Sequence, residues 1–126
     1  MKKVDLLNFL DKLNFPKDEY YILSGASLVL RGIREEAEDL DLCISEELFN
    51  QIKDQYELTD DKKNECGFYK INDNFEVVVN KKEDFKMEKG EKYNLEDLKT
   101  ILEFKIKRNK PKDKKDIENI RKYLNQ

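Results

Sequence analysis

The first part of the chain shows two kinds of apolar spacing. Leucines at helical intervals predict an amphipathic helix over residues 3–14, which ends before Pro16. A β-favouring run at residues 20–23 then passes through Ser24-Gly25 into a helix expected over residues 26–30. The predicted order is therefore helix, strand, tight turn and helix.

Apolar and polar positions alternate from residue 39 to residue 44. This period of two predicts a strand with one face toward a core. The other face carries two carboxylates, Asp39 and Asp41. Ser45 is expected to cap a helix that begins at Glu46 and runs to about residue 56, because acidic residues occupy its first turn.

Strand and helix patterns follow one another in the second half. The β-like runs at residues 66–71 and 75–79 are separated by a turn-forming triplet and predict an antiparallel hairpin. The charged stretch at residues 81–92 is expected to form a loop or an irregular edge. Asn94 is expected to cap a helix that breaks near Pro111, and a last helix is predicted over residues 112–124.

These patterns predict a single α/β (α+β) domain over residues 1–126. Its sheet should be mixed, partly antiparallel and flanked by helices, with further helices in the carboxy-terminal part. No apolar run approaches the roughly 20 residues that cross a bilayer, and the amino terminus has no signal-peptide pattern. We therefore expect a cytoplasmic protein without membrane contact.

Two residue types restrict the chemistry. Histidine is absent, which excludes Ser/His and Cys/His hydrolases and every His-ligated zinc site. The two cysteines, Cys43 and Cys66, form neither a disulfide framework nor a CxxC motif, as expected in a reducing compartment.

Charge is unevenly distributed although the formal net charge is only -3. Residues 105–126 hold nine Lys and Arg against three Asp and Glu, whereas the rest of the chain holds 16 against 25. A basic segment opposite an acidic body is typical of a surface that faces a polyanion, and equally of a solvated helix face.

Three carboxylates on strands are the candidate metal ligands. Asp39 and Asp41 lie on one face of their strand, and Glu76 interrupts a later apolar strand. Oxygen ligands without histidine favour Mg²⁺ over zinc. Each acid alone is also compatible with an outward-facing polar position, but Asp is disfavoured in strands and two on one face concentrate repulsive charge.

The turn Ser24-Gly25-Ala26-Ser27 is the candidate phosphate site. Without a Cβ at Gly25, a phosphate can approach the backbone N–H groups, and the Ser24 and Ser27 hydroxyls add donors. The alternative is an ordinary connection between strand and helix. The segment does not fit GxxxxGK[ST], which argues against a P-loop ATPase.

Two segments together resemble the nucleotidyltransferase superfamily. LSGASLVLRGIREEAEDLDLCIS is similar to its signature, in which a Gly- and Ser-containing turn is followed by Asp-x-Asp, with a third acid on a later strand. LEDLKTILEFKIKRNKPKDKKDIENIRKYL is similar to the carboxy-terminal segment of small bacterial and phage members, including those related to AbiEii-type toxins.

The resemblance implies an enzyme that transfers a nucleoside monophosphate from a triphosphate such as ATP to an acceptor hydroxyl. Asp39, Asp41 and Glu76 would be the catalytic acids and would ligate two Mg²⁺ ions. The nucleotide-binding residues would come from the turn and from the basic segment: Ser24, Gly25, Ser27, Lys105, Arg108 and Lys112. Asp113 and Asp116 would orient these cations, and Arg31 and Arg34 would face either phosphate or solvent.

Two other functions remain open at this point. One is a catalytically inactive module that binds a nucleotide or a cognate protein, such as one half of a toxin–antitoxin pair, which the acidic residues 36–41 favour. The other is an RNA-binding module that uses the basic segment, although the chain has no stacking aromatic motif. The acceptor itself is left open among RNA, protein and small molecules.

Overall fold

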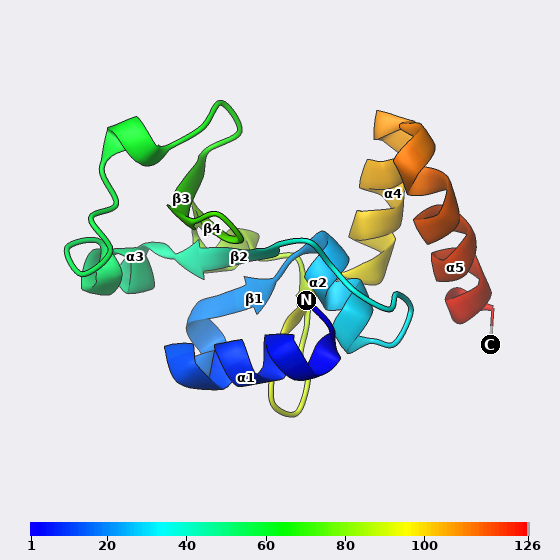
Figure 1. The fold of residues 1–126 in the computed structure, drawn as a ribbon, viewed down its shortest axis with the longest axis horizontal. Coiled ribbons are helices and arrows are strands. Elements are labelled where there is room, and N and C mark those ends of the chain that lie inside the picture. Colours follow the sequence, from blue (N-terminus) through cyan, green and yellow to red (C-terminus); the bar gives the residue numbers. More distant parts are fainter. Residues whose placement is uncertain (126) are drawn as a thin grey trace.

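The computed structural model describes residues 1–125 and has the mixed α/β architecture that the sequence predicts (Figure 1). Five α-helices and six strands occur in these residues. The helices are α1 Lys3–Leu13, α2 Ser24–Leu30, α3 Glu46–Ile52, α4 Leu98–Arg108 and α5 Lys114–Leu124. The strands are β1 Tyr20–Ile22, β2 Leu40–Ser45, β3 Phe68–Asn72, β4 Phe75–Asn80, β5 Met87–Glu88 and β6 Leu95–Glu96.

The strands form one mixed sheet in the order β3-β4-β2-β1-β6-β5. The predicted hairpin of β3 and β4 is antiparallel, while β4 pairs with β2 in parallel. On its other side β2 pairs antiparallel with β1, and β1 pairs in parallel with β6. Strand β2 is therefore central, and its partners come from both halves of the chain.

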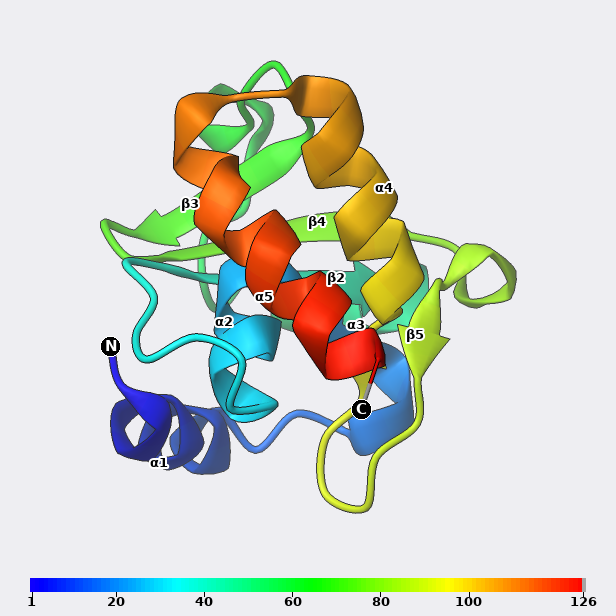
Figure 2. The same ribbon diagram turned by 90° about the vertical axis from the view of Figure 1, so that its right-hand side faces the viewer.

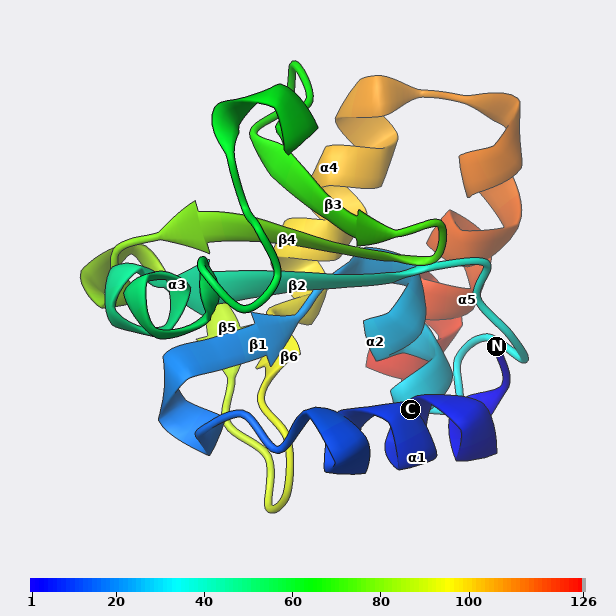
Figure 3. The same cartoon turned by 60° about the vertical axis from the view of Figure 1, so that its left-hand side comes forward.

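The alternation along β2 works as predicted. Leu40, Leu42 and Ile44 are fully buried and belong to the main apolar cluster, which also takes in α1, α2 and α3. Helices α1 and α2 lie next to each other against this cluster (Figure 3). Ser45 caps α3, since its side chain accepts a hydrogen bond from the N–H of Leu48.

Helices α4 and α5 run side by side at the end of the molecule opposite α3 (Figures 1 and 2). A second apolar cluster attaches them to the rest of the protein. It is formed by Leu28 of α2, Leu98 and Ile101 of α4, and Ile120 of α5, all at most 2% exposed. No helix of the described residues has both the length and the apolar character that crossing a membrane requires.

Three predicted helix starts are wrong, and the largest error concerns the helix expected from Asn94. The helix expected from Asn94 begins at Leu98, and its cap is Asp97, whose side chain accepts from the N–H of Thr100. Leu95 belongs to strand β6 because it pairs with Ile22, and tertiary pairing overrides the helical pattern. Asn94 is buried and its side chain contacts the backbone of Lys17 and Gly90.

The other two corrections are smaller. Helix α2 begins at Ser24 rather than at residue 26. Ser24 and Gly25 thus lie in the first turn of the helix, not in a turn before it. At the far end of the chain, residues 111–113 form a 3₁₀ turn and α5 starts at Lys114, two residues later than predicted.

The central position of β2 leads to a stability prediction. Leu42 pairs with Ile22 and Val77 across the sheet, and all three are fully buried. We expect Leu42→Ala to lower the free energy of unfolding by about 2–5 kcal/mol, because a cavity replaces buried methyl groups. Urea unfolding followed by circular dichroism measures this. Val4→Ala, at a side chain that is 62% exposed, is the control, and equal stability of the two variants would contradict the assigned core.

Candidate functional site

A pocket of about 640 Å³ opens between the first half of the chain and the α4–α5 pair. One wall comes from the start of α2, residues 33–38 and the start of β2; the other comes from α4, the 3₁₀ turn and α5. Of the nine predicted site residues, seven line it: Ser24, Gly25, Asp39, Asp41, Lys105, Arg108 and Lys112. Acidic side chains thus face basic ones across the pocket.

The acidic wall is built around Asp41. In the register of the parallel pair β2–β4, Asp41 is the direct partner of Glu76, and side chains at paired positions project from the same face of a sheet. Burial, the charge of Glu76 and the charge of Asp39 raise the pKa of Asp41 from 3.8 to about 6. Asp41 is therefore close enough to each of the other two predicted acids to be repelled by it.

The acids are near one another without forming a preassembled metal cage. Glu76 is half-buried beside Asp41 but does not itself line the pocket. Among residues 1–125, no group of three or more Cys, Asp or Glu side chains meets the spacing of a metal site. Mg²⁺ commonly takes only one or two carboxylates and completes its shell with water and substrate phosphates. The donor set of Asp39, Asp41 and Glu76 therefore fits Mg²⁺ that arrives with a phosphate ligand.

The turn at Ser24 is held in an unusual conformation. Ser24 has a φ of +36°, a region that residues other than glycine rarely adopt. Its N–H donates a 2.8 Å hydrogen bond to the side chain of Glu96 in β6. Burial raises the pKa of Glu96. A carboxylate from a distant strand thus stabilises the turn at the pocket wall.

Gly25 permits a close contact in the same turn. A Cβ placed there would lie 3.0 Å from Nη1 of Arg34. Arg34 lines the pocket, and its Nη1 is 3.5 Å from the Asp116 carboxylate of α5. Arg34 therefore connects the two walls.

Ser27 and Arg31 are placed away from the pocket. The Ser27 side chain is fully buried, and its hydroxyl donates a 2.6 Å hydrogen bond to the carbonyl oxygen of Ser24. Arg31 is also buried and pairs with Glu88 and with the backbone oxygen of Glu96. The hydroxyl expected to contact phosphate instead supports the turn from inside.

The basic wall contains a buried ion-pair network. The Lys105 side chain is only 4% exposed, and its Nζ lies 3.4 Å from Asp113 and 3.3 Å from Asp116. Arg108 donates to both oxygens of Asp113, at 2.9 and 2.5 Å. The expectation that these two aspartates orient the cations agrees with these contacts. With Arg34 included, the network holds three cations and two carboxylates, so the network itself carries an excess of one positive charge.

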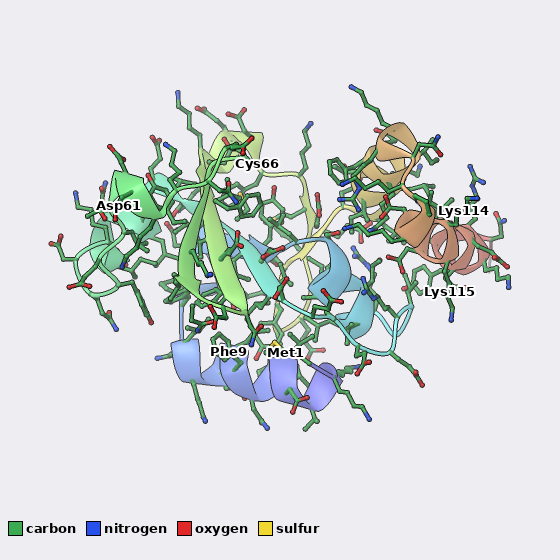
Figure 4. The ribbon with its side chains drawn as sticks, turned by 45° about the horizontal axis from the view of Figure 1, so that its top comes forward. Met1, Phe9, Asp61, Cys66, Lys114 and Lys115 are labelled. Carbon is green, nitrogen blue, oxygen red and sulfur yellow. The ribbon has the colours of Figure 1, made fainter. Side chains whose placement is uncertain are left out.

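Exposed lysines extend the basic wall. Lys112 and Lys115 both line the pocket, and neither makes an ion pair among the described residues. Lys114 and Lys115 lie at the start of α5, far from the loop that carries Asp61 and Cys66 (Figure 4). The basic wall thus combines two cations held by ion pairs, Lys105 and Arg108, with two exposed lysines. Such an arrangement is suited to binding phosphate groups.

Glu96 was not predicted as a site residue, because its segment has a helical apolar pattern and a charged residue there is expected on the surface.

A scan of protein-family models, a search of curated proteins and a search of solved structures each found no match.

The repulsion around Asp41 predicts a variant that is more stable than the wild type. Because the folded-state pKa of about 6 exceeds the ordinary 3.8, the folded protein binds the proton more tightly, and stability falls as pH rises between these values. Asp41→Asn removes this penalty. Without divalent ions we expect a gain of about 1–2 kcal/mol at pH 8 that shrinks toward pH 4, measured by urea unfolding. A loss of stability at pH 8 would contradict the crowding of the acids.

The charge of Asp113 should stabilise the folded protein, whereas the charge of Asp41 destabilises it. Hydrogen bonding to Arg108 and the nearby Lys105 lower its pKa from 3.8 to about 2, so its contribution is complete above pH 4 and is lost as pH falls toward 2. Asp113→Asn should cost about 3–5 kcal/mol at pH 7, because the buried Lys105 loses one of its two carboxylate partners and Arg108 loses the carboxylate that binds it.

The difference between wild type and Asp113→Asn should narrow below pH 4 in the same unfolding assay. Glu118→Gln is the control, since the Glu118–Lys122 pair on α5 is largely exposed, 66% and 69%, and such pairs contribute little. A difference independent of pH would show that the charge of Asp113 is not what stabilises the network.

Proposed function

We propose that this protein is a Mg²⁺-dependent nucleotidyltransferase that transfers a nucleoside monophosphate from a nucleoside triphosphate to an acceptor hydroxyl. The single observation that carries the proposal is the register of β2 and β4. It sets Glu76 beside Asp41, and Asp41 lines a pocket whose opposite wall is cationic. Acids at one wall and cations at the other are what a metal–triphosphate complex needs on its two sides.

The basic wall would bind the phosphates. Lys105 and Arg108 are held in place by Asp113 and Asp116, so they do not lose side-chain freedom when an anion enters. Lys112 would close over the phosphates from the rim. On the other wall, the strained turn at Ser24-Gly25 would bring peptide groups close to the same phosphates.

The acidic wall would serve the attacking group. Asp39, Asp41 and Glu76 would hold Mg²⁺, which when bound neutralises phosphate charge and lowers the pKa of the acceptor hydroxyl. The acceptor oxygen forms a bond to the α-phosphorus, the bond to the β-phosphate oxygen breaks, and pyrophosphate leaves. Glu76, the strand partner of Asp41, would help to take up the hydroxyl proton together with Asp41.

One observation favours a second candidate, a nucleotide-binding or partner-binding module without turnover. Glu35, Glu36 and Glu38 also line the pocket and add negative charge next to the proposed triphosphate site. These residues would weaken triphosphate binding or would receive a basic segment of a cognate protein.

The test separates transfer from binding. Purified protein is incubated with Mg²⁺, each of the four α-labelled triphosphates, and RNA, protein or small-molecule hydroxyl acceptors, and label in the product is counted. We expect transfer by the wild type and a loss of at least about 100-fold in Asp39→Asn and in Asp41→Asn, because metal and charge stabilisation contribute several kcal/mol.

Asp61→Asn is the matched control, since Asp61 is exposed and far from α5 (Figure 4), and it should keep full activity. Full transfer by the double variant Asp39→Asn/Asp41→Asn would end the enzyme proposal. Mg²⁺-dependent binding of a triphosphate that is never transferred would favour the second candidate.

A further inference from the structure

Phe104 is an exposed aromatic residue in the middle of α4. Its side chain is 54% exposed, and it belongs to neither of the two apolar clusters, although Leu98, Ile101 and Leu102 of the same helix all join the second one. Burying a phenylalanine is worth about 1.5–3 kcal/mol. The fold leaves more than half of this ring in solvent, where it is open to a ligand.

Phe104 lies close to a residue that lines the pocket. Helix geometry places it about 40° around α4 from Arg108, and the Cζ atom of Arg108 lies 5.0 Å from the centre of the ring. Arg108 and the adjacent Lys105 both line the pocket. The ring itself is not part of the pocket lining, but it lies directly next to Arg108, one of the lining cations proposed to bind phosphate.

The other exposed apolar side chains near the end of the chain lie farther from the pocket cations than Phe104 does. Ile106 is also exposed, at 43%, but it lies about 160° around the helix from Arg108. The other exposed aromatic of the described residues, Tyr123, is in the last turn of α5, whereas the pocket contacts α5 only from Lys115 to Asn119. Phe104 is thus the exposed aromatic that adjoins the basic wall.

We propose that Phe104 is the stacking surface for the base of the bound nucleotide, an inference that rests on the proposed function. In a nucleotide the base is separated from the α-phosphate by one sugar, so a phosphate paired with Arg108 leaves the base within reach of the neighbouring ring. Asp113 fixes the Arg108 guanidinium on one side of Phe104. Stacking on an aromatic ring accepts every base, because each has a π-face.

The chain contains no tryptophan, which gives the proposal a direct reporter. In Phe104→Trp, excitation at a wavelength that the six tyrosines do not absorb gives fluorescence from the introduced ring alone. We expect a saturable decrease in fluorescence when ATP, GTP, CTP or UTP is added with Mg²⁺, and none with inorganic tripolyphosphate, which has no base. Ile106→Trp is the matched control on the same helix and should not respond to either.

Affinity provides the second readout. By isothermal titration calorimetry, Phe104→Ala should bind the triphosphates about 5- to 100-fold more weakly than the wild type, the range expected for loss of one base–aromatic stack. Its affinity for tripolyphosphate should be unchanged, because the cations remain. Circular dichroism checks that Phe104→Ala keeps its fold, as expected for an exposed position.

The outcomes distinguish this inference from the proposed function. The wild type can bind triphosphates more tightly than tripolyphosphate while Phe104→Ala binds triphosphates as tightly as the wild type does. In that case the base lies elsewhere and the stacking role is wrong, but nucleotide binding stands. Equal fluorescence changes in Phe104→Trp and Ile106→Trp overturn it in the same way. If the wild type binds neither triphosphate nor tripolyphosphate, the proposed function fails and the stacking role fails with it.

Discussion

The parallel pairing of β2 with β4 is the constraint on which the rest of this structure depends. Because successive side chains of a strand alternate between faces, the same six residues of β2 supply Leu40, Leu42 and Ile44 to the core and leave Asp41 on the opposite face. A shift of the register by one residue would exchange these roles. The apolar core therefore determines where the carboxylates lie, and the repulsion between Asp41 and Glu76 is tolerated because the burial on the other face outweighs it.

The second wall of the pocket depends on a different kind of interaction. Helices α4 and α5 are joined to each other through the ion pairs of Lys105 with Asp113 and Asp116, and to α2 through the small apolar cluster. A buried lysine is costly unless its charge is fully paired. Here the pairing has a structural benefit, because it fixes both the spacing of the two helices and the direction of their cations.

The sequence predicted most of the fold because its strongest patterns are local. The alternation in β2, the Ser45 cap and the turn before β4 each act within a few residues, and each was confirmed. The errors at Asn94 and Ser24 both arise from long-range contacts. Leu95 becomes a strand residue by pairing with Ile22, and the conformation of Ser24 depends on Glu96, 72 residues away.

The site was predictable by residue type but not by arrangement. Asp39, Asp41, Gly25 and the basic residues were identified from spacing and from a resemblance, and the structure brings them to one pocket. Three features of the arrangement could not be inferred from the sequence. The Ser27 side chain is buried, and Glu76 does not line the pocket, because strand order and packing are not encoded locally. Lys105 is buried, whereas lysines are ordinarily exposed.

The origin of the two walls in separate parts of the chain affects how the protein acquires its site during synthesis. Most of the main apolar cluster comes from residues 6–79, so the part that carries Asp39, Asp41 and Glu76 leaves the ribosome first. The cations of the opposite wall follow only with residues 105–115. During synthesis the acidic wall is therefore complete in sequence before the basic wall exists, and the pocket forms only when α4 and α5 dock on α2.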